Sequence, residues 1–338
     1  MTSISAISIR SIAIDRPLDP LLIDPVLTGR FRADTDQLWA QDERLGLAIS
    51  GGPDSMALLA LCHAIRPGSI EAVTVDHGLR AESAAEAEQV ARICADLGVP
   101  HQILRITVAE GNVQQEARLA RYAAMEDWLK RQEIGCLATA HHADDQAETF
   151  LMRLGRGSGV AGLAGVRKDS VVPGGTQRLI RPLLNWRKAE LVQVTDGAGL
   201  GYVTDPSNAD LSFDRVRMRQ QLAETQWLDP QAISASAAHL AEADAAIEWM
   251  AEQEWSGRVR RIGQRHIYRP FAPPIVQMRI AARLLKAITG KQPRGSVVAD
   301  LVTRLSAGES GNAGGVLVTI VGDAWRFEKE PRRRTQEP

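Results

Sequence analysis

Residues 45–61 have the sequence Leu45-Gly46-Leu47-Ala48-Ile49-Ser50-Gly51-Gly52-Pro53-Asp54-Ser55-Met56-Ala57-Leu58-Leu59-Ala60-Leu61. A short apolar run gives way at Ser50 to a polar, glycine-rich loop, and a helical apolar pattern follows. This order predicts a buried strand, a tight loop and the start of a helix. Gly51 and Gly52 allow positive φ angles and let a ligand approach the backbone. The N–H groups of the loop and the N-terminus of the helix would then face an anion together.

The loop is not of the Walker type, because it is shorter and no Lys follows its last Gly. A loop without Lys suits a pyrophosphate leaving group whose charge is neutralised by other residues. Two glycines alone would favour an ordinary strand–helix turn. The whole hexapeptide resembles the PP-loop of the ATP pyrophosphatase superfamily, which activates substrates by adenylation and releases pyrophosphate. The resemblance assigns ATP binding to Ser50, Gly51, Gly52, Pro53, Asp54 and Ser55.

Length and composition indicate a two-domain globular protein of 338 residues, 44% hydrophobic and 24% charged. No apolar run approaches the ~18 residues of a membrane span, so we expect no membrane partner. Residues 1–34 lack the apolar core of a signal peptide, and we expect an irregular, partly disordered leader there. The three scattered cysteines argue against a disulfide framework or zinc site and favour a reducing cytoplasm. Oligomeric state is undecided, and a dimer is one alternative.

The net charge of −1 conceals an asymmetry along the chain. From Ser256 to the C-terminus there are 16 Lys and Arg against 6 Asp and Glu, a net charge of +10, and the remainder carries −11. This C-terminal excess favours an anionic partner such as RNA. A solvated, arginine-rich surface explains it equally well.

Strands and helices alternate along the first half of the chain. After the opening stretch we expect strands at Ile70–Asp76, His101–Val108 and Cys136–Ala140, and helices at Ala81–Leu97, Val113–Arg131 and Ala143–Leu154. Such alternation predicts an α/β fold, with a parallel sheet covered by helices on both faces. Further on, the pattern predicts helices at Trp186–Leu200, Pro230–Trp255 and Val276–Ile288, strands within Arg258–Phe271, and a strand pair within Gly315–Glu328.

Polar clusters follow three of the expected strands. They are Ser50–Ser55, then Asp76-His77-Gly78-Leu79-Arg80, and then His141–Glu148. Ligands of open α/β sheets bind beyond the carboxyl ends of the strands, so the clusters should meet at one site. Asp76 and His77 are therefore expected near the adenosine part of the nucleotide, although a strand-end cap and a surface histidine would also fit.

The segment His141–Glu148 holds two histidines and three carboxylates. If it opens a helix, His141, Asp145 and Glu148 share one face. Such a face could bind zinc, yet Mg²⁺ that bridges phosphates prefers one or two carboxylates and water, and Asp54 and Asp145 are the candidates. Acidic residues at a helix N-terminus are also favoured by the helix dipole alone.

Arginines add the positive charge that a phosphate site needs. Arg118 and Arg121 lie in the helix expected before the strand at Cys136–Ala140, and they could clamp phosphates or could simply be exposed charges on that helix. Arg156 lies in the glycine-rich segment Gly155–Gly165, whose composition suits a mobile lid or an RNA-facing loop.

Taken together, these motifs resemble the bacterial tRNA(Ile)-lysidine synthetase family over roughly residues 45–225. The match consists of Ser50–Ser55, Val75–Arg80, Glu116–Tyr122, Ala138–Arg153, Gly155–Gly165, Arg181–Leu184, Asp205–Asn208 and Arg215–Arg219. One departure is Val216, where the family usually has Asn, which puts the contact of that position in doubt.

The resemblance implies an adenine-nucleotide α-hydrolase-like catalytic domain over residues 35–228, a helical connector over 229–257 and a smaller α+β domain over 258–338 that grips tRNA. ATP would adenylate the wobble cytidine of a CAU-anticodon isoleucine tRNA, with Mg²⁺, and free L-lysine would displace AMP to give lysidine. The implied catalytic residues are Asp54, Arg118, Arg121, His141, Asp145 and Glu148, and the implied tRNA-binding residues are Arg156, Arg215, Arg217 and Arg219. Asp145 and Glu148 could instead hold the lysine ammonium group.

Two other functions stay open at this point. A tRNA thiolation enzyme would use the same adenylation, but it typically needs paired cysteines, and the chain has no Cys-x-x-Cys. A catalytically inactive RNA-binding module is a further alternative, and the intact clusters at Ser50–Ser55 and His141–Glu148 count against it.

Overall fold

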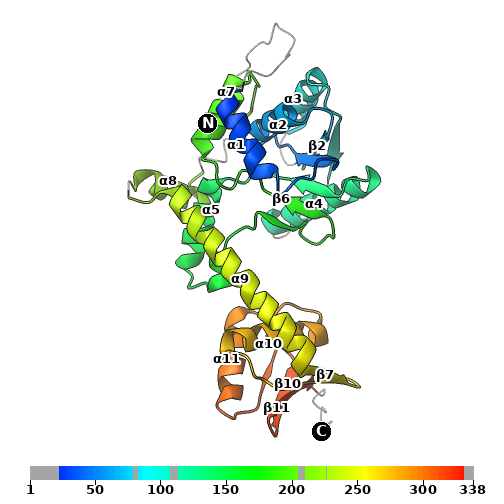
Figure 1. The fold of residues 1–338 in the computed structure, drawn as a ribbon, viewed down its shortest axis with the longest axis vertical. Helices are drawn as coiled ribbons and strands as arrows, with labels where there is room; N and C mark the ends of the chain where they lie inside the picture. Colours follow the sequence, from blue (N-terminus) through cyan, green and yellow to red (C-terminus); the bar gives the residue numbers. More distant parts are fainter. Residues whose placement is uncertain (1–22, 79–82, 107–112, 205–209, 226, 331–338) are drawn as a thin grey trace, which may run out of the picture. The chain divides into compact units, whose positions relative to one another are not determined.

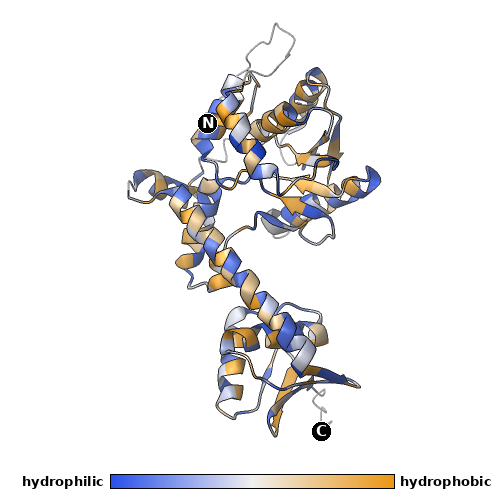
Figure 2. Cartoon of the chain, viewed as in Figure 1, coloured by the Kyte–Doolittle hydropathy of each residue, from blue (hydrophilic) through white to orange (hydrophobic). Residues whose placement is uncertain are grey.

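The computed structural model describes residues 23–78, 83–106, 113–204, 210–225 and 227–330. The chain divides into two compact units, Met1–Ala241 (unit 1) and Glu242–Pro338 (unit 2). The division lies inside a long helix, α9 (Pro230–Arg258), and therefore within the segment expected to be a connector. Both hydrophilic and hydrophobic residues run along α9 (Figure 2).

Unit 1 is built on a six-stranded sheet with the order β3-β2-β1-β4-β6-β5. Its strands are β1 (Leu45–Ala48), β2 (Ile70–Asp76), β3 (His101–Arg105), β4 (Cys136–Ala138), β5 (Asp169–Val171) and β6 (Arg178–Ile180). All neighbouring strands pair in parallel except β5, which is antiparallel to β6 at the edge. The expected parallel α/β fold is confirmed. The third and fourth expected strands end earlier than predicted, at Arg105 and Ala138.

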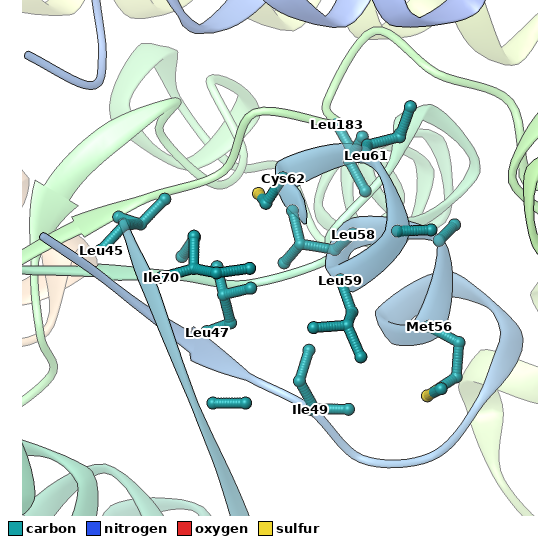
Figure 3. Packing of buried hydrophobic residues seen from close by; sticks show 14 of the residues in the cluster. Leu45, Leu47, Ile49, Met56, Leu58, Leu59, Leu61, Cys62, Ile70 and Leu183 are labelled. Carbon is teal, nitrogen blue, oxygen red and sulfur yellow. The ribbon is translucent and has the colours of Figure 1, made fainter. Parts of the chain in front are cut away.

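Helices cover both faces of this sheet (Figure 1). One face packs against α1 (Pro25–Thr35), α2 (Pro53–Ile65), α3 (Ser83–Asp96) and α7 (Lys188–Gly197), and the other against α4 (Val113–Arg131). The alternation along β1 explains this arrangement, because Leu45 and Leu47 enter the first core (Figure 3). Gly46 between them faces α4, where a Cβ would lie 2.8 Å from Trp128 Cζ3. Only glycine therefore lets α4 approach so closely.

The expected irregular leader is wrong from Pro25 onward, because α1 is a regular helix. Asp24 caps it by accepting from the Val26 N–H at 2.8 Å, and Pro25 occupies the first turn. Phe31 is fully buried against Trp186, with ring centroids 6.3 Å apart. This contact makes the helix part of the main core. Residues 1–22 lie outside the described residues.

The strand order places a ligand site at one point of the sheet. From β1 the chain moves outward through β2 to β3, and it then returns to the opposite side of β1 as β4. This reversal leaves the carboxyl ends of β1 and β4 side by side, where open α/β sheets bind ligands. The loop 49–52 and the N-terminus of α5 (Ala143–Leu154) both begin there.

Unit 2 is an antiparallel sheet with the order β7-β8-β11-β10-β9 and two helices. The elements are β7 (Val259–Ile262), β8 (Arg265–Tyr268), α10 (Pro274–Thr289), α11 (Gly295–Ser306), β9 (Gly311–Ala313), β10 (Val316–Val321) and β11 (Ala324–Lys329). Tyr268, Phe327 and residues of α10 such as Ile280 and Leu284 are buried. The predicted strand pair and the predicted helix at 276–288 are confirmed. Among the described residues, no helix is long and apolar enough to cross a membrane.

The basic charge of the C-terminal region is partly balanced within unit 2. Because the unit starts at Glu242, it contains five acidic residues of α9, and its net charge is +5 rather than +10. Arg283 pairs with Glu248 at 2.5 Å and Glu252 at 2.8 Å, and Arg279 pairs with Asp244. These pairs use arginines to pack α10 onto α9, which removes them from the free basic surface.

Candidate active site

The loop after β1 has the geometry of an anion site. Gly51 has a φ of +83°, and a Cβ there would lie 3.3 Å from Val90 Cγ2. Ser55 Oγ accepts from the Ser50 N–H at 3.2 Å and donates to the Gly52 carbonyl at 2.9 Å, which closes the loop. Gly52 is the N-cap of α2 and has no side chain to cap the first turn. The first N–H groups of α2 are therefore left for a ligand.

A second helix start, that of α5, carries a cluster of charged groups. His142 is its N-cap, and the His142 N–H donates to Asp145 Oδ2 at 3.2 Å. The His142 ring lies among three carboxylates, with Nε2 3.5 Å from both Asp54 Oδ2 and Asp145 Oδ2, and Nδ1 3.6 Å from Asp144 Oδ2. We call His142 and these three carboxylates the carboxylate cluster. It joins the loop after β1 to the helix after β4.

The carboxylates keep His142 positively charged. Burial by itself lowers the pKa of this imidazole, but hydrogen bonds to Asp144 and Asp54 and the charge of Asp145 outweigh burial and raise it to about 10. The Nδ1 atom thus lies close both to Asp144 Oδ2 and to the Asp145 backbone nitrogen, which is 3.4 Å away. Although burial raises the pKa of Asp145, the charges of His142 and Arg215 hold it below its usual range.

His141 lies differently from the prediction. It precedes the N-cap and is not on α5, so it does not share a helical face with Asp145 and Glu148. Its Nδ1 is 3.0 Å from Thr139 Oγ1. Burial lowers the pKa of His141 to about 3. The charge of Asp145 raises this pKa, whereas the charges of Arg181 and Arg118 lower it further. The two adjacent histidines are thus held in opposite charge states.

Glu148 is buried and bound by two arginines of α8 (Asp214–Glu224). Its exposed fraction is 1%, and it accepts from Arg215 Nε at 2.6 Å and from Arg219 Nε at 2.6 Å. Arg215 Nη2 also donates to Asp145 Oδ1 at 2.8 Å. Two of the four arginines predicted to bind tRNA therefore reach the candidate active-site carboxylates instead of standing free at the surface.

The other two predicted tRNA-binding arginines pair with Asp214 and not with Glu148 or Asp145. Arg217 pairs with Asp214 and donates to the Leu211 carbonyl at 2.7 Å, and Arg156 Nη2 is 3.5 Å from Asp214 Oδ2. The segment expected to be a mobile lid contains a short helix, α6 (Val160–Leu163), and is bonded back to α5. Gln146 accepts from the Val166 N–H at 2.9 Å, and Arg153 donates to the Gly162 carbonyl at 2.6 Å.

Arg118 and Arg121 flank the ring of Tyr122, with guanidinium carbons 5.1 Å and 5.5 Å from its centroid. Burial lowers the pKa of Arg121, and it also lowers that of Arg181, which follows β6. We call Arg118, Arg121 and Arg181 the arginine cluster. Within the described part of the chain, Arg121 Nε and Arg181 Nε are buried without a hydrogen-bond partner. Such unpartnered buried donors suit an anionic ligand.

Asp76 acts as the strand-end cap that was one of its two expected roles. Its Oδ1 accepts from the Gly78 N–H at 2.9 Å and from Ser83 Oγ at 2.6 Å, and these two bonds hold its pKa below the usual range. Burial lowers the pKa of His77, and the charge of Arg121 lowers it further. His77 therefore lies close to the arginine cluster.

Comparison with known proteins fits this geometry. A family model described as a PP-loop domain matches residues 27–226. A tRNA(Ile)-lysidine synthase from Novosphingobium aromaticivorans is 46% identical over 91% of this chain and 95% of its own length. The enzyme of that name from Zymomonas mobilis is 42% identical over 86% of this chain and 90% of its own. The chain belongs to the tRNA(Ile)-lysidine synthase family.

A solved structure supports the fold of this synthase family member. The U34-tRNA thiolase NcsA from Methanococcus maripaludis superposes with a TM-score of 0.52, at 17% identity, over 63% of this chain and 75% of its own. At that identity the likeness concerns the fold alone. The three cysteines of the present chain, Cys62, Cys94 and Cys136, are free and buried.

The residues of the carboxylate cluster fit a magnesium ion in this synthase. Asp54 Oδ1 is buried and, among the described residues, has no hydrogen-bond partner, so it is the oxygen of the cluster that is left for a cation. In the described part of the chain no three donors form a preassembled metal site. Mg²⁺ takes one or two carboxylates and completes its shell with phosphate oxygens and water, so Asp54 and Asp145 are enough protein ligands for it.

Sequence reasoning missed His142 and Arg181 as site residues. The signal for His142 was its place three residues before Asp145, which is the spacing of a capping box. Arg181 stood in a recognised motif, but only the pairing of β6 with β4 brings it beside Arg118. Asp205–Asn208, part of the predicted motif set, lie outside the described residues.

Proposed function

We propose that this chain converts the wobble cytidine of a CAU-anticodon isoleucine tRNA to lysidine, using ATP and free L-lysine. The observation that carries the proposal is the carboxylate cluster, which joins the PP-loop to the start of α5 where the strand order reverses. Membership of the tRNA(Ile)-lysidine synthase family supports it independently. The free, buried cysteines agree with a reducing cytoplasm as the place of work.

In the first step the C2 oxygen of the cytidine attacks the α-phosphorus of ATP, and pyrophosphate leaves. Residues Ser50–Ser55 and the N-terminus of α2 would bind the pyrophosphate through N–H groups and hydroxyls. The arginine cluster would stabilise the charge that develops on the phosphoryl oxygens. Asp54 and Asp145 would hold a Mg²⁺ ion, which supplies further neutralisation of the phosphates when it is bound.

In the second step the amine of lysine attacks C2, and AMP leaves. The amine must first lose a proton, because an ammonium group is not a nucleophile. Asp145 and Glu148 are the carboxylates that would meet the lysine ammonium group. In the structure Arg215 bonds to both, so a lysine that binds there would have to share or displace Arg215.

Unit 2 would contribute contacts to the body of the tRNA. The net charge of +5 supports this role, and exposed basic groups of β7 and β8 include Arg260, Arg261 and Arg265. Phosphate contacts release counterions, so tRNA affinity should fall steeply with salt.

The experiment is an assay of tRNA-dependent AMP release, with thermal melting of each variant. Asp54→Ala should abolish AMP release while the variant still folds and melts in one cooperative transition. The matched control is Asp127→Ala, which removes an exposed carboxylate from α4 and should leave both values unchanged. Near-normal AMP release by folded Asp54→Ala would remove Asp54 from the site.

A further inference from the structure

A groove separates the C-terminal half of α5 from α8, away from the carboxylate cluster. Its volume is about 310 Å³. Three apolar side chains line it, Leu151 and Met152 from α5 and Met218 from α8, and all three are half-buried. The charged lining residues are Arg156, Asp214 and Arg217. The groove thus combines an apolar wall with a basic rim. Its volume is at the lower end of the range found for ligand sites (~300–1,000 Å³).

Along both helices the groove follows the residues of the candidate active site. On α5, Leu151 and Met152 follow Glu148 by one helical turn, and on α8, Met218 follows Arg215 by one turn. One turn of helix is about 5.4 Å long. This offset is about the distance between adjacent units of an extended polymer, so a polymer whose reacting unit lies beside Glu148 would bring its next unit to the groove.

The cations of the rim are available to an anion. Arg156 and Arg217 share the single carboxylate of Asp214, and their side chains are 66% and 50% exposed. Exposed pairs of this kind contribute little to stability, so exchanging Asp214 for a phosphate has a low energetic cost. Arg217 also donates to two backbone carbonyls, at 2.7 Å and 3.0 Å, which fixes the direction of its guanidinium group.

We propose that this groove binds the nucleotide next to the reacting cytidine in the RNA chain. Its base packs against Met152 and Met218, and its phosphate contacts Arg156 and Arg217. A base has an apolar face of the kind that these thioethers contact well, and an RNA substrate must continue past the base that reacts. The inference rests on the proposed function, since it takes the cytidine to react beside Glu148.

The test is a thermodynamic cycle on full-length enzyme with isoleucine tRNA. Two further tRNAs each lack the base of one neighbour of the wobble cytidine, on its 5′ or its 3′ side. Affinities are measured without ATP by fluorescence anisotropy, for wild type and for Met218→Ala, and lysine incorporation is followed in the same preparations. The matched control is Met250→Ala, which truncates a 37% exposed methionine of α9 that does not line the groove.

We expect Met218→Ala to weaken binding of intact tRNA about tenfold, and to have no further effect on the tRNA that lacks the base bound in the groove. Equal weakening for all three tRNAs, or none, would overturn the inference. Arg217→Gln tests the rim separately and should lower the slope of log K against log salt by about one. An unchanged slope would also contradict it. If the wild type incorporates lysine while these outcomes fail, the groove assignment is wrong and the proposed function stands. If the wild type incorporates none, the proposed function fails.

Discussion

Replacing His142 by Gln should abolish one pH dependence of stability. The His142 side chain is 4% exposed and lies between Asp54, Asp144 and Asp145, which raise its pKa to about 10. Because this value is above the ordinary 6.5 of histidine, the proton on His142 stabilises the folded state. The stabilisation is complete below pH 6.5 and is lost as the pH rises toward 10.

The expected size follows from the linkage of protonation to folding. Between the pKa of the unfolded state and that of the folded state, each rise of one pH unit lowers the free energy of unfolding by about 1.4 kcal/mol. The contribution of His142 to the stability of the wild type should therefore fall by about 2–3 kcal/mol between pH 6.5 and pH 8.5. His142→Gln lacks this loss. The matched control is His141→Gln, because the pKa of His141 is lowered to about 3 and its ring is neutral throughout this range.

The assay is urea unfolding at pH 6.5, 7.5 and 8.5 without Mg²⁺, followed by tryptophan fluorescence. Trp39, Trp128 and Trp186 are buried in unit 1 and report on it. Wild type and His141→Gln should lose stability together as the pH rises, and His142→Gln should change less. Titration of unfolded cysteines affects all three proteins equally. Parallel curves for all three would refute a protonated His142 in the folded state.

Three further changes test packing and pairing. Gly165→Ala should destabilise unit 1 by about 1–3 kcal/mol, because Gly165 has a φ of +63° and a Cβ there would lie 2.4 Å from Gln146 Oε1. Thermal melting measures this loss, and an unchanged melting temperature would contradict it. Phe31→Ala should lower the free energy of unfolding in urea by about 3–5 kcal/mol if α1 belongs to the core. A loss below about 1 kcal/mol would show that α1 is not part of the core. Arg219→Leu should lower the free energy of unfolding by about 1–2 kcal/mol, because the buried Glu148 loses one of its charged partners and that partner is itself 34% exposed. A gain in stability would contradict the pairing.

Helices and strands were predicted well from the sequence where a periodic pattern of apolar residues is bounded by residues that mark its ends. The predicted bounds of β2, α4 and α5 match the structure, because the apolar pattern changes abruptly at each end. Short or weakly patterned elements were missed, including β5, β6, β9 and α8. The two apolar residues of β6, Leu179 and Ile180, do not identify a strand by themselves, and only the pairing with β4 defines it. α1 was missed although Asp24-Pro25 is a good helix-start signal, because its apolar residues are few.

The site was predictable in composition but not in its pairing. The clusters at strand ends predicted that Asp54 and Asp145 meet, since parallel strands share an edge. Which of two adjacent histidines points into the cluster depends on where α5 begins, and a shift of one residue decides it. The contact of Arg215 with Glu148 joins residues far apart in sequence, across two helices whose packing has no local signal.

Incorporation of labelled lysine into RNA tests the central claim most directly. Enzyme, ATP and Mg²⁺ are incubated with radiolabelled L-lysine and isoleucine tRNA, and the RNA is then digested to nucleosides. We expect one labelled nucleoside, which disappears when ATP is omitted or when the wobble cytidine is replaced. Absence of label from the RNA, together with a thiolated base when a sulfur donor is supplied, would contradict the account and assign the site to thiolation.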